Sequence, residues 1–244
     1  MKKFLVPILI AFATTSCMGQ NEKNIVYDAN AVARVAKNFH EVEVSGAIDL
    51  YLSQGNEEAV AVSGSSSEIA AKIKTEVKNG VLKIYFDNQG SGWKSWGNAK
   101  MKAYVTFKNL NRIEASGACN VKAPQTIKAA DLKIEMSGAS DFVGDIVASN
   151  LKLDASGASN MKVSGMASDV TIDASGASSI KGYELKTAMC KIDASGAASV
   201  RIRVNKELTA EASGGSCVYY KGDGVIKYMD ASGGASIKKK AEGE

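Results

Sequence analysis

The sequence is poor in the residues that usually carry catalytic or metal-binding chemistry. Its 244 residues include a single histidine, His40, and four cysteines. His40 lies in the segment FHEVEV, which has the alternation of a strand, so we expect a packed or edge position rather than a metal ligand or general base. With no second histidine, a Ser-His-Asp arrangement cannot form elsewhere in the chain. The sequence therefore predicts no catalytic residue, no metal site and no cofactor.

The cysteines do not form the pattern of a disulfide framework. Cys119 and Cys217 are about five sequence repeats apart, which is roughly 24 Å if the repeats stack like neighbouring strands. A disulfide needs Cα atoms within about 7 Å of each other. Cys190 falls in a column of mostly apolar residues. We therefore expect buried free thiols at these three positions.

The net charge of the chain is also low, and its apolar runs are short. The formal charge is +4, and it falls further if Lys2 and Lys3 are removed with a leader, so bulk charge indicates neither a nucleic acid nor an anionic membrane as partner. With 45% hydrophobic residues and only two prolines, the chain can bury a core as one elongated domain or as two abutting halves.

The most apolar segment, Phe4 to Ala13, is too short to cross a bilayer. It follows Lys2-Lys3 and ends at Thr14-Thr15-Ser16-Cys17, so residues 1–17 are predicted to be a signal peptide with a lipobox-like end. In a bacterial lipobox the cysteine becomes the lipidated N-terminus, although Thr14 stands where leucine is commonest. Lipid attachment at Cys17 is the main hypothesis, and ordinary signal cleavage or an incidental cysteine are the alternatives. The protein is then exported and held at the outer membrane or cell envelope, with residues 18–37 as a tether that includes a short helix at Ala29 to Lys37.

What the chain has in abundance is a short repeat. The hexapeptide DASGAS occurs twice in full, and Ser-Gly pairs recur about every 19 residues. A fixed period of this size is typical of stacked units that cannot bury their apolar faces alone. The serines of the pairs are Ser116, Ser137, Ser156, Ser175, Ser195, Ser213 and Ser232.

Counting from each of these serines as position 0, apolar residues occupy positions −3 and +5, which places one inward-facing residue on each side of a corner. A residue without Cβ at position +1 suits a tight corner with positive φ. The hydroxyl at position 0 is then available to bond local backbone groups. The predicted corner glycines are Gly117, Gly138, Gly157, Gly176, Gly196, Gly214 and Gly233.

The outward positions carry columns of charge. Position −2 is Asp or Glu in every unit, and position −4 is basic in most of them. Stacked carboxylates repel, but the basic column lies within diagonal reach, so we predict a neutralised, solvated face, with cation binding as the alternative. A second basic column stands at position +6: Lys122, Lys162, Lys181, Arg201 and Lys238. It indicates a solvated strand face, with polyanion binding as the alternative.

Together these columns predict an all-β fold, a parallel β-helix (solenoid) with coils of about 19 residues over residues 111–240. Residues 38–110 form its less regular, β-rich N-terminal part. In that part Lys78-Asn79-Gly80 predicts a hairpin, and Ser66 to Ala71 predicts one helical turn capped by Ser66.

One segment departs from the repeat. Residues 90–97, GSGWKSWG, contain both tryptophans, Trp93 and Trp96, between glycines, and predict a loop. Two rings three residues apart either cap one end of the solenoid core or form a contact site for a glycan or a partner protein.

Several stretches resemble a known family. VSGAIDLYLSQGNEEAVAVSG, IKTEVKNGVLKIYF and KAYVTFKNLNRIEASGACNVKA, followed by the SGAS array, are similar to the bacterial family "putative auto-transporter adhesin, head GIN domain" over roughly residues 38–238. The resemblance implies a β-helical domain, often on a lipoprotein of the cell envelope, and supplies no catalytic residue.

Two hypotheses for function follow. The first is a non-catalytic, lipid-anchored envelope protein that binds glycans or another envelope protein as an adhesin-like or scaffolding module. The second is a carbohydrate-active β-helix enzyme acting on envelope or host polysaccharide. An even distribution of Asp and Glu over the coils favours the first, and convergent carboxylates in a cleft would favour the second.

Overall fold

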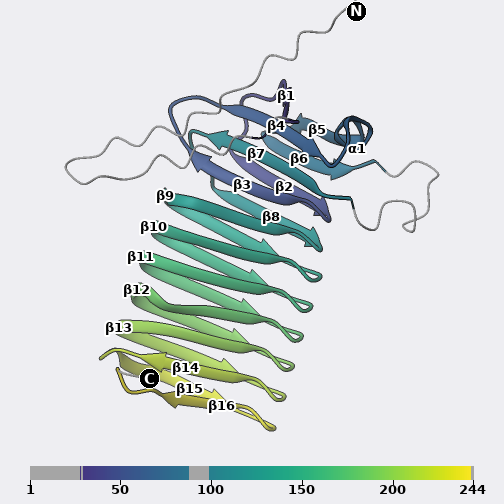
Figure 1. The fold of residues 1–244 in the computed structure, drawn as a ribbon. Coiled ribbons are helices and arrows are strands. Elements are labelled where there is room, and N and C mark those ends of the chain that lie inside the picture. The colour runs from purple at the N-terminus through teal and green to yellow at the C-terminus, as the bar shows by residue number, and fades with distance from the viewer. Residues whose placement is uncertain (1–27, 29, 88–98, 243–244) are drawn as a thin grey trace, which may run out of the picture.

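The chain forms an all-β, parallel β-solenoid of about seven turns with a spacing of about 19 residues, as the repeat predicts. A computed structural model describes residue 28, residues 30–87 and residues 99–242. In Figure 1 the irregular N-terminal strands lie at the upper end and the regular coils descend to the C-terminus. The elements are β1 (Val32–Arg34), β2 (Glu41–Gly46), β3 (Asp49–Gln54), β4 (Ala59–Gly64), α1 (Ser67–Lys72), β5 (Ile73–Lys78), β6 (Val81–Phe86), β7 (Met101–Phe107), β8 (Arg112–Gly117), β9 (Asn120–Met136), β10 (Asp141–Ala155), β11 (Asn160–Ala174), β12 (Ser179–Ala194), β13 (Ser199–Ala212), β14 (Cys217–Lys221), β15 (Val225–Ala231) and β16 (Ser236–Lys239).

Each of the long strands β9 to β13 contributes to two sheets. The first residues of β9 pair with β3 and its last residues with β8, while the two parts of β13 pair with β14 and β15. One sheet faces the viewer in Figure 1, and we call it the front sheet. It contains β3, the first parts of β9–β13, β14 and β16. The sheet that contains β2, β8, the second parts of β9–β13 and β15 is the back sheet. The Ser-Gly corners join the back sheet of one coil to the front sheet of the next.

The core lies between the two sheets and is built from the predicted apolar columns. At position −3, Ile134, Leu153 and Ile172 are fully buried, and at position +5 so are Phe142 and Ile180. Parallel, in-register pairing stacks like residues on one another, for example Leu153 on Ile134 and Ile172 on Leu153. Stacking therefore buries faces that no single coil could cover.

The corners explain why the repeat keeps glycine. All seven glycines at position +1 have positive φ, between 67° and 87°. A Cβ on Gly157 would lie 2.6 Å from the carbonyl oxygen of Gly138, one coil earlier. That oxygen accepts a 2.7 Å hydrogen bond from the backbone N–H of Ala158. Each corner is thus hydrogen-bonded directly to the previous one, at a distance that leaves no room for a side chain.

The second serine of SGAS, at position +3, is a feature that the column analysis did not assign. Ser140, Ser159, Ser178 and Ser216 are almost completely buried. The Ser159 hydroxyl donates to the Met136 carbonyl oxygen at 3.3 Å, and the Ser216 hydroxyl donates to the Ala194 carbonyl oxygen at 3.0 Å. In these two coils the buried +3 hydroxyl therefore bonds the backbone of the preceding coil, whereas the Ser178 hydroxyl has no hydrogen-bond partner among the described residues. At position 0, Ser137 makes a similar contact at 3.4 Å.

The N-terminal part widens both sheets. β6 and β2 extend the back sheet in parallel, and β7 and then the antiparallel β4 extend the front sheet. The predicted hairpin is confirmed, since β5 and β6 pair antiparallel around Asn79 and Gly80, both with positive φ. The helical turn is also confirmed: the Ser66 side chain caps α1 by accepting from the backbone N–H of Ile69.

The short helix predicted at Ala29 to Lys37 is wrong. Residues Val32–Arg34 form the edge strand β1, which pairs antiparallel with β4. An unpaired strand edge supplies backbone partners that a three-residue segment can use more readily than it can nucleate a helix. Arg34 adds a hydrogen bond from its guanidinium to the Ala70 carbonyl oxygen at 2.9 Å.

Candidate functional site

The back sheet carries a shallow groove along the acidic column. It has a volume of about 400 Å³ and is lined by carboxylates from successive coils together with the position-0 serines. The acidic residues that line it are Glu114, Glu135, Asp154, Asp173 and Asp193. Parallel pairing in register places one carboxylate per coil, so the groove follows the solenoid axis.

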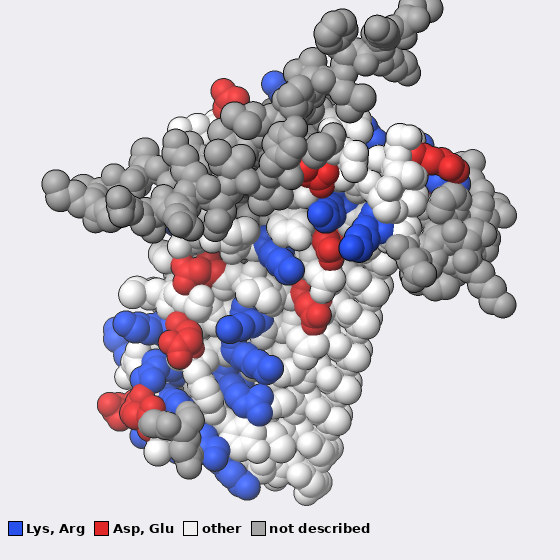
Figure 2. Space-filling view, viewed as in Figure 1, with Lys and Arg blue, Asp and Glu red and all other residues white. Residues whose placement is uncertain are grey.

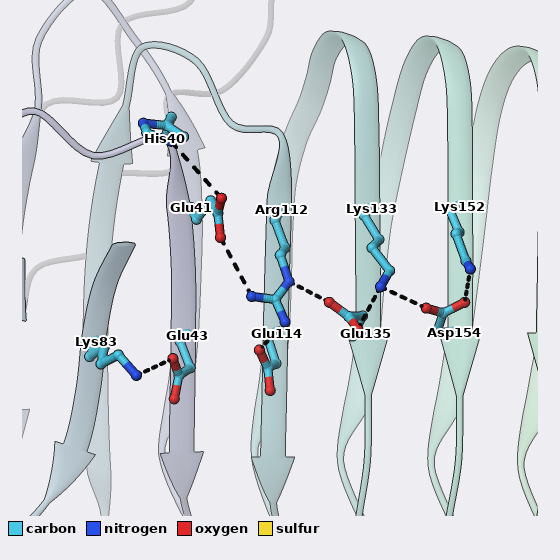
Figure 3. Close-up of polar contacts among 10 residues, drawn as sticks. All are labelled: His40, Glu41, Glu43, Lys83, Arg112, Glu114, Lys133, Glu135, Lys152 and Asp154. Atoms are coloured by element: carbon cyan, nitrogen blue, oxygen red, sulfur yellow. Dashed lines mark hydrogen bonds and ion pairs between the residues drawn. The ribbon is translucent and has the colours of Figure 1, made fainter. Parts of the chain in front are cut away.

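Arg112 begins a chain of ion pairs across this groove (Figure 3). Its guanidinium lies 3.5 Å from a carboxylate oxygen of Glu41 and 2.5 Å from one of Glu114, and it donates a hydrogen bond to Glu135. Glu135 also accepts from the Lys133 ammonium at 2.7 Å. One arginine thus forms ion pairs with carboxylates from β2, β8 and β9.

The chain continues into the next coils. The Lys133 ammonium is 3.1 Å from Asp154, and the Lys152 ammonium is 3.5 Å from Asp154 and 2.9 Å from Asp173. Arg112, Lys133 and Lys152, all at position −4, therefore each bridge the carboxylate of their own coil and that of the following coil. Figure 3 shows these bridges for Arg112 and Lys133. We call this set, from Glu41 to Asp173, the paired ladder.

Burial and hydrogen bonding shift the pKa values of the carboxylates in the paired ladder in opposite directions. Burial by itself raises the pKa of Glu135, but hydrogen bonds from Lys133 and Arg112 outweigh it and lower the pKa overall. For Asp173 burial is likewise outweighed, mainly by the hydrogen bond from Lys152, and its pKa is lowered. Burial raises the pKa of Asp154, whose Oδ1 accepts no hydrogen bond from a described residue.

The paired ladder stops after Asp173. Position −4 is Thr171 in that coil, so no basic side chain of this column bridges Asp173 and Asp193. Lys191 occupies position −4 in the next coil but forms no ion pair with a described residue, and Thr209 follows it. The predicted pairing of the acidic and basic columns is thus seen in the coils up to β11, although three cations there face five carboxylates and neutralise them only in part. Beyond them, Asp193 and Glu211 have no ion-pair partner among the described residues.

The front sheet has a different arrangement. From β11 to β16, position +6 forms a column in direct register, and we call its members the basic strip: Lys162, Lys181, Arg201, Tyr219 and Lys238. Figure 2 shows lysines and arginines running down this face towards the C-terminal end. Within the described ranges, no carboxylate forms an ion pair with the four cations of the basic strip. Applying the column analysis to the neighbouring positions +4 and +8 would have revealed this difference from sequence.

His40 lies at the N-terminal end of the paired ladder, and the cysteines are free thiols. The His40 ring packs over the turn at Gly80, with its Nε2 atom 3.9 Å from Glu41. Cys119 and Cys190 are buried free thiols, and burial raises the pKa of each. Cys217 is a half-buried free thiol. Among the residues that the structure describes, no group of His, Cys, Asp and Glu side chains is arranged to hold a metal ion.

The remaining predicted site residues, Cys17, Trp93 and Trp96, lie outside the described residues. Lipid attachment and the role of the tryptophan segment therefore stay predictions. In the described parts of the chain, no helix has the length and apolar character needed to span a membrane.

Solved structures share this fold. A "putative adhesin" from Bacteroides fragilis has a TM-score of 0.77 at 21% identity, with 86% of this chain and 96% of that chain covered. A "putative lipid binding protein" from Parabacteroides distasonis has a TM-score of 0.65 at 21% identity over 86% and 96% of the two chains. A "putative adhesin" from Parabacteroides merdae has a TM-score of 0.59 at 17% identity over 86% and 95%. No curated protein matches the sequence.

A family model matches residues 38–224, which include both the irregular N-terminal strands and the Ser-Gly coils. The matched range begins just before β2 and ends just before β15, so it spans both sheets of the solenoid. The chain therefore belongs to the family "putative auto-transporter adhesin, head GIN domain".

Proposed function

We propose that the protein is a non-catalytic, adhesin-like binding module of the cell envelope, anchored by a lipid on Cys17. The observation that carries this proposal is the pair of broad solenoid faces, on which outward side chains of one kind recur over several successive coils. Such a surface suits an extended partner that makes many similar contacts. The family description and the names of the structural relatives agree with a binding role.

A carbohydrate-active enzyme is the second candidate. Asp154, with a raised pKa, lies next to Asp173, with a lowered pKa, and such a split is typical of an acid and a base in glycoside hydrolysis. However, the Lys152 ammonium contacts both carboxylates, at 3.5 Å and 2.9 Å. This bridge accounts for the pair as part of the paired ladder, so we favour the binding module.

The two candidates separate in one experiment. Purified protein is incubated with polysaccharide extracted from the cell envelope, and both retention of the polysaccharide and release of new reducing ends are measured. A binding module retains the polysaccharide and leaves its length unchanged. Release of reducing ends that disappears in Asp154→Asn would overturn the proposal in favour of the enzyme, and neither retention nor release would overturn both candidates.

The anchor has its own prediction. Because Cys17 is the proposed lipid attachment site, Cys17→Ala should move the protein from the membrane fraction to the soluble fraction. Cys217→Ala is the matched control and should leave the protein with the membranes. Unchanged membrane partitioning of Cys17→Ala after carbonate washing would contradict the anchor.

Trp93 and Trp96 are proposed either to form a contact site or to cap the core, and one double variant separates the two. If they form a contact site, replacing both by alanine should weaken polysaccharide retention without changing the melting temperature. A large drop in melting temperature would assign them to a cap of the core instead.

A further inference from the structure

The basic strip is unusual because its charges are stacked without compensation. Lys162, Lys181 and Arg201 are direct register partners on β11, β12 and β13, so their backbones are about 4.8 Å apart. Like charges placed opposite one another across paired strands destabilise a sheet. On the back sheet the same spacing is relieved by the paired ladder, where Lys133 and Lys152 each contact two carboxylates. The front sheet has no equivalent relief within the described residues.

The columns that flank the basic strip are neutral or add to its charge. Position +4 carries Asn160, Ser179, Ser199, Cys217 and Ser236, and position +8 carries Ser164, Tyr183, Arg203, Lys221 and Lys240. Within these columns the carboxylates, Asp49, Asp141 and Asp145, belong to the first coils. At the far end Glu242 pairs with Arg203, and Glu184 and Asp223 lie close enough to act on the same guanidinium. The front sheet therefore carries acidic side chains at both ends, whereas the basic strip itself contains no carboxylate from β11 to β16 (Figure 2).

Two tyrosines hold several of these cations in place. The Arg201 guanidinium and the Lys240 ammonium each lie 5.6 Å from the centre of the Tyr219 ring, and the Lys221 ammonium lies 4.5 Å from that of Tyr183. Cation–π contacts of this kind restrict long side chains before a ligand arrives, which lowers the entropic cost of binding. A groove of about 230 Å³ lies beside Lys162 and Lys181 at the upper end of the strip.

We propose that the basic strip binds an acidic polysaccharide that lies along the solenoid axis, across the strands. Its carboxylate, sulfate or phosphate groups meet the cations on successive coils, and its hydroxyls meet the amide and hydroxyl side chains at position +4. This inference rests on the proposed binding function and names the ligand class and the surface. The partner is a polyanion because the four cations of the basic strip, three of them directly stacked, have no ion-pair partner among the described residues, whereas a neutral glycan would leave their repulsion unchanged.

The same residues argue against two other polyanions. A membrane-binding face usually projects large apolar side chains, and none of the exposed large apolar residues lies in the three columns at +4, +6 and +8 from β11 onwards. Single-stranded nucleic acid is usually bound by aromatic rings that stack on its bases. Here Lys221 lies over the Tyr183 ring and Arg201 over the Tyr219 ring, so one face of each ring is already in contact with a cation. An acidic polysaccharide needs neither feature.

The test measures binding of the full chain to polygalacturonate and heparin, with dextran, an oligo-dT strand and phosphatidylglycerol vesicles as comparison ligands. We expect both acidic glycans to bind and dextran not to bind, with affinity falling linearly on a log–log plot against salt. The triple variant Lys162→Gln, Lys181→Gln, Arg201→Gln should lose about tenfold or more in affinity at low salt, because three contacts between a cation and an anionic group of the glycan are removed. The control Lys74→Gln, Lys78→Gln, Lys100→Gln changes net charge equally at the other end of the molecule and should keep the affinity.

Three results would overturn the inference: equal losses in both triple variants, no binding of either acidic glycan, or tighter binding of the oligo-dT strand or the vesicles. Retention of envelope polysaccharide by the triple variant at the unaltered level would refute the basic strip and leave the proposed function intact. Cleavage of the polysaccharide would instead refute the proposed function. Circular dichroism of each variant shows that the solenoid is folded.

Discussion

The two faces of the solenoid are built on one backbone and differ in how they treat their charges. On the back sheet, Lys133 lies between Glu135 and Asp154, and each cation of the paired ladder is shared between coils. On the front sheet, Lys181 stacks between Lys162 and Arg201. Strand spacing and register are common to both faces, so geometry cannot be the source of the difference.

The difference shows which parts of the repeat are constrained by folding. Inward columns and corners are fixed by packing and by coil-to-coil hydrogen bonds. The residue types of the outward columns are not constrained by packing or by backbone hydrogen bonds. Their side chains can therefore stabilise the stack, as on the back sheet, or bind a ligand, as we propose for the front sheet.

The largest effect should come from exchanging an inward residue. Phe142 is 1% exposed in the core, and the next residue, Val143, is 46% exposed on the front sheet. Phe142→Ala should lower the free energy of unfolding by about 3–5 kcal/mol, the usual cost of removing a buried aromatic ring. Val143→Ala should cost less than about 0.5 kcal/mol. Similar costs in urea denaturation would show that inward and outward columns are not distinct.

The corners should show the next largest effect. Gly157→Ala forces a Cβ into positive φ and against the Gly138 carbonyl oxygen, and should cost about 1–3 kcal/mol. Gly215→Ala is the control, because its Cβ would lie 3.7 Å from the nearest atom and its φ is not positive. Thermal unfolding curves of the two variants that coincide would contradict the role of the corner.

Within the paired ladder the effect should be smaller and depend on pH. Glu135 has a pKa below its ordinary value of 4.5, so its charge stabilises the fold above that pH, and this stabilisation is lost as pH falls through the lowered pKa. Glu135→Gln should therefore cost about 1 kcal/mol at pH 7 and little at acidic pH. Asp154→Asn, at the next coil, should cost less at pH 7 because burial raises the pKa of Asp154. Denaturation of both variants at pH 7 and at acidic pH measures these losses. Equal losses of unfolding free energy in the two variants would contradict the expected difference.

Much of the fold could be predicted from sequence because the repeat makes each position occur many times. The apolar residues at −3 and +5 predicted the core, and the glycine at +1 predicted each corner. Each of these predictions needs only the residue type at a single position of the repeat. The short helix at Ala29 to Lys37 could not be corrected in this way. β1 forms there only because β4, far along the chain, offers a free edge.

The site could be predicted only in part. The paired ladder follows from opposite charges in adjacent columns, and its end at Thr171 is visible in the sequence. The cation–π contacts of Tyr219 were not expected, because they join Lys240 and Arg201 from coils on either side. The buried serines were also missed, because serine is ordinarily a surface residue and only the stacked corner supplies the backbone acceptors for its hydroxyl.

The most direct test of the contrast between the faces is the change in unfolding free energy on removing one cation from each, measured at several salt concentrations. Lys133→Gln breaks two ion pairs of the paired ladder and should destabilise the protein by about 0.5–1 kcal/mol at low salt. Lys181→Gln relieves repulsion from Lys162 and Arg201 and should leave stability unchanged or raise it by a few tenths of a kcal/mol, about the scale of a cross-strand charge pair. Added salt should bring the two variants together, because it screens both interactions. Destabilisation of the same size by both substitutions at low salt would contradict the claim that one face compensates its charges and the other does not.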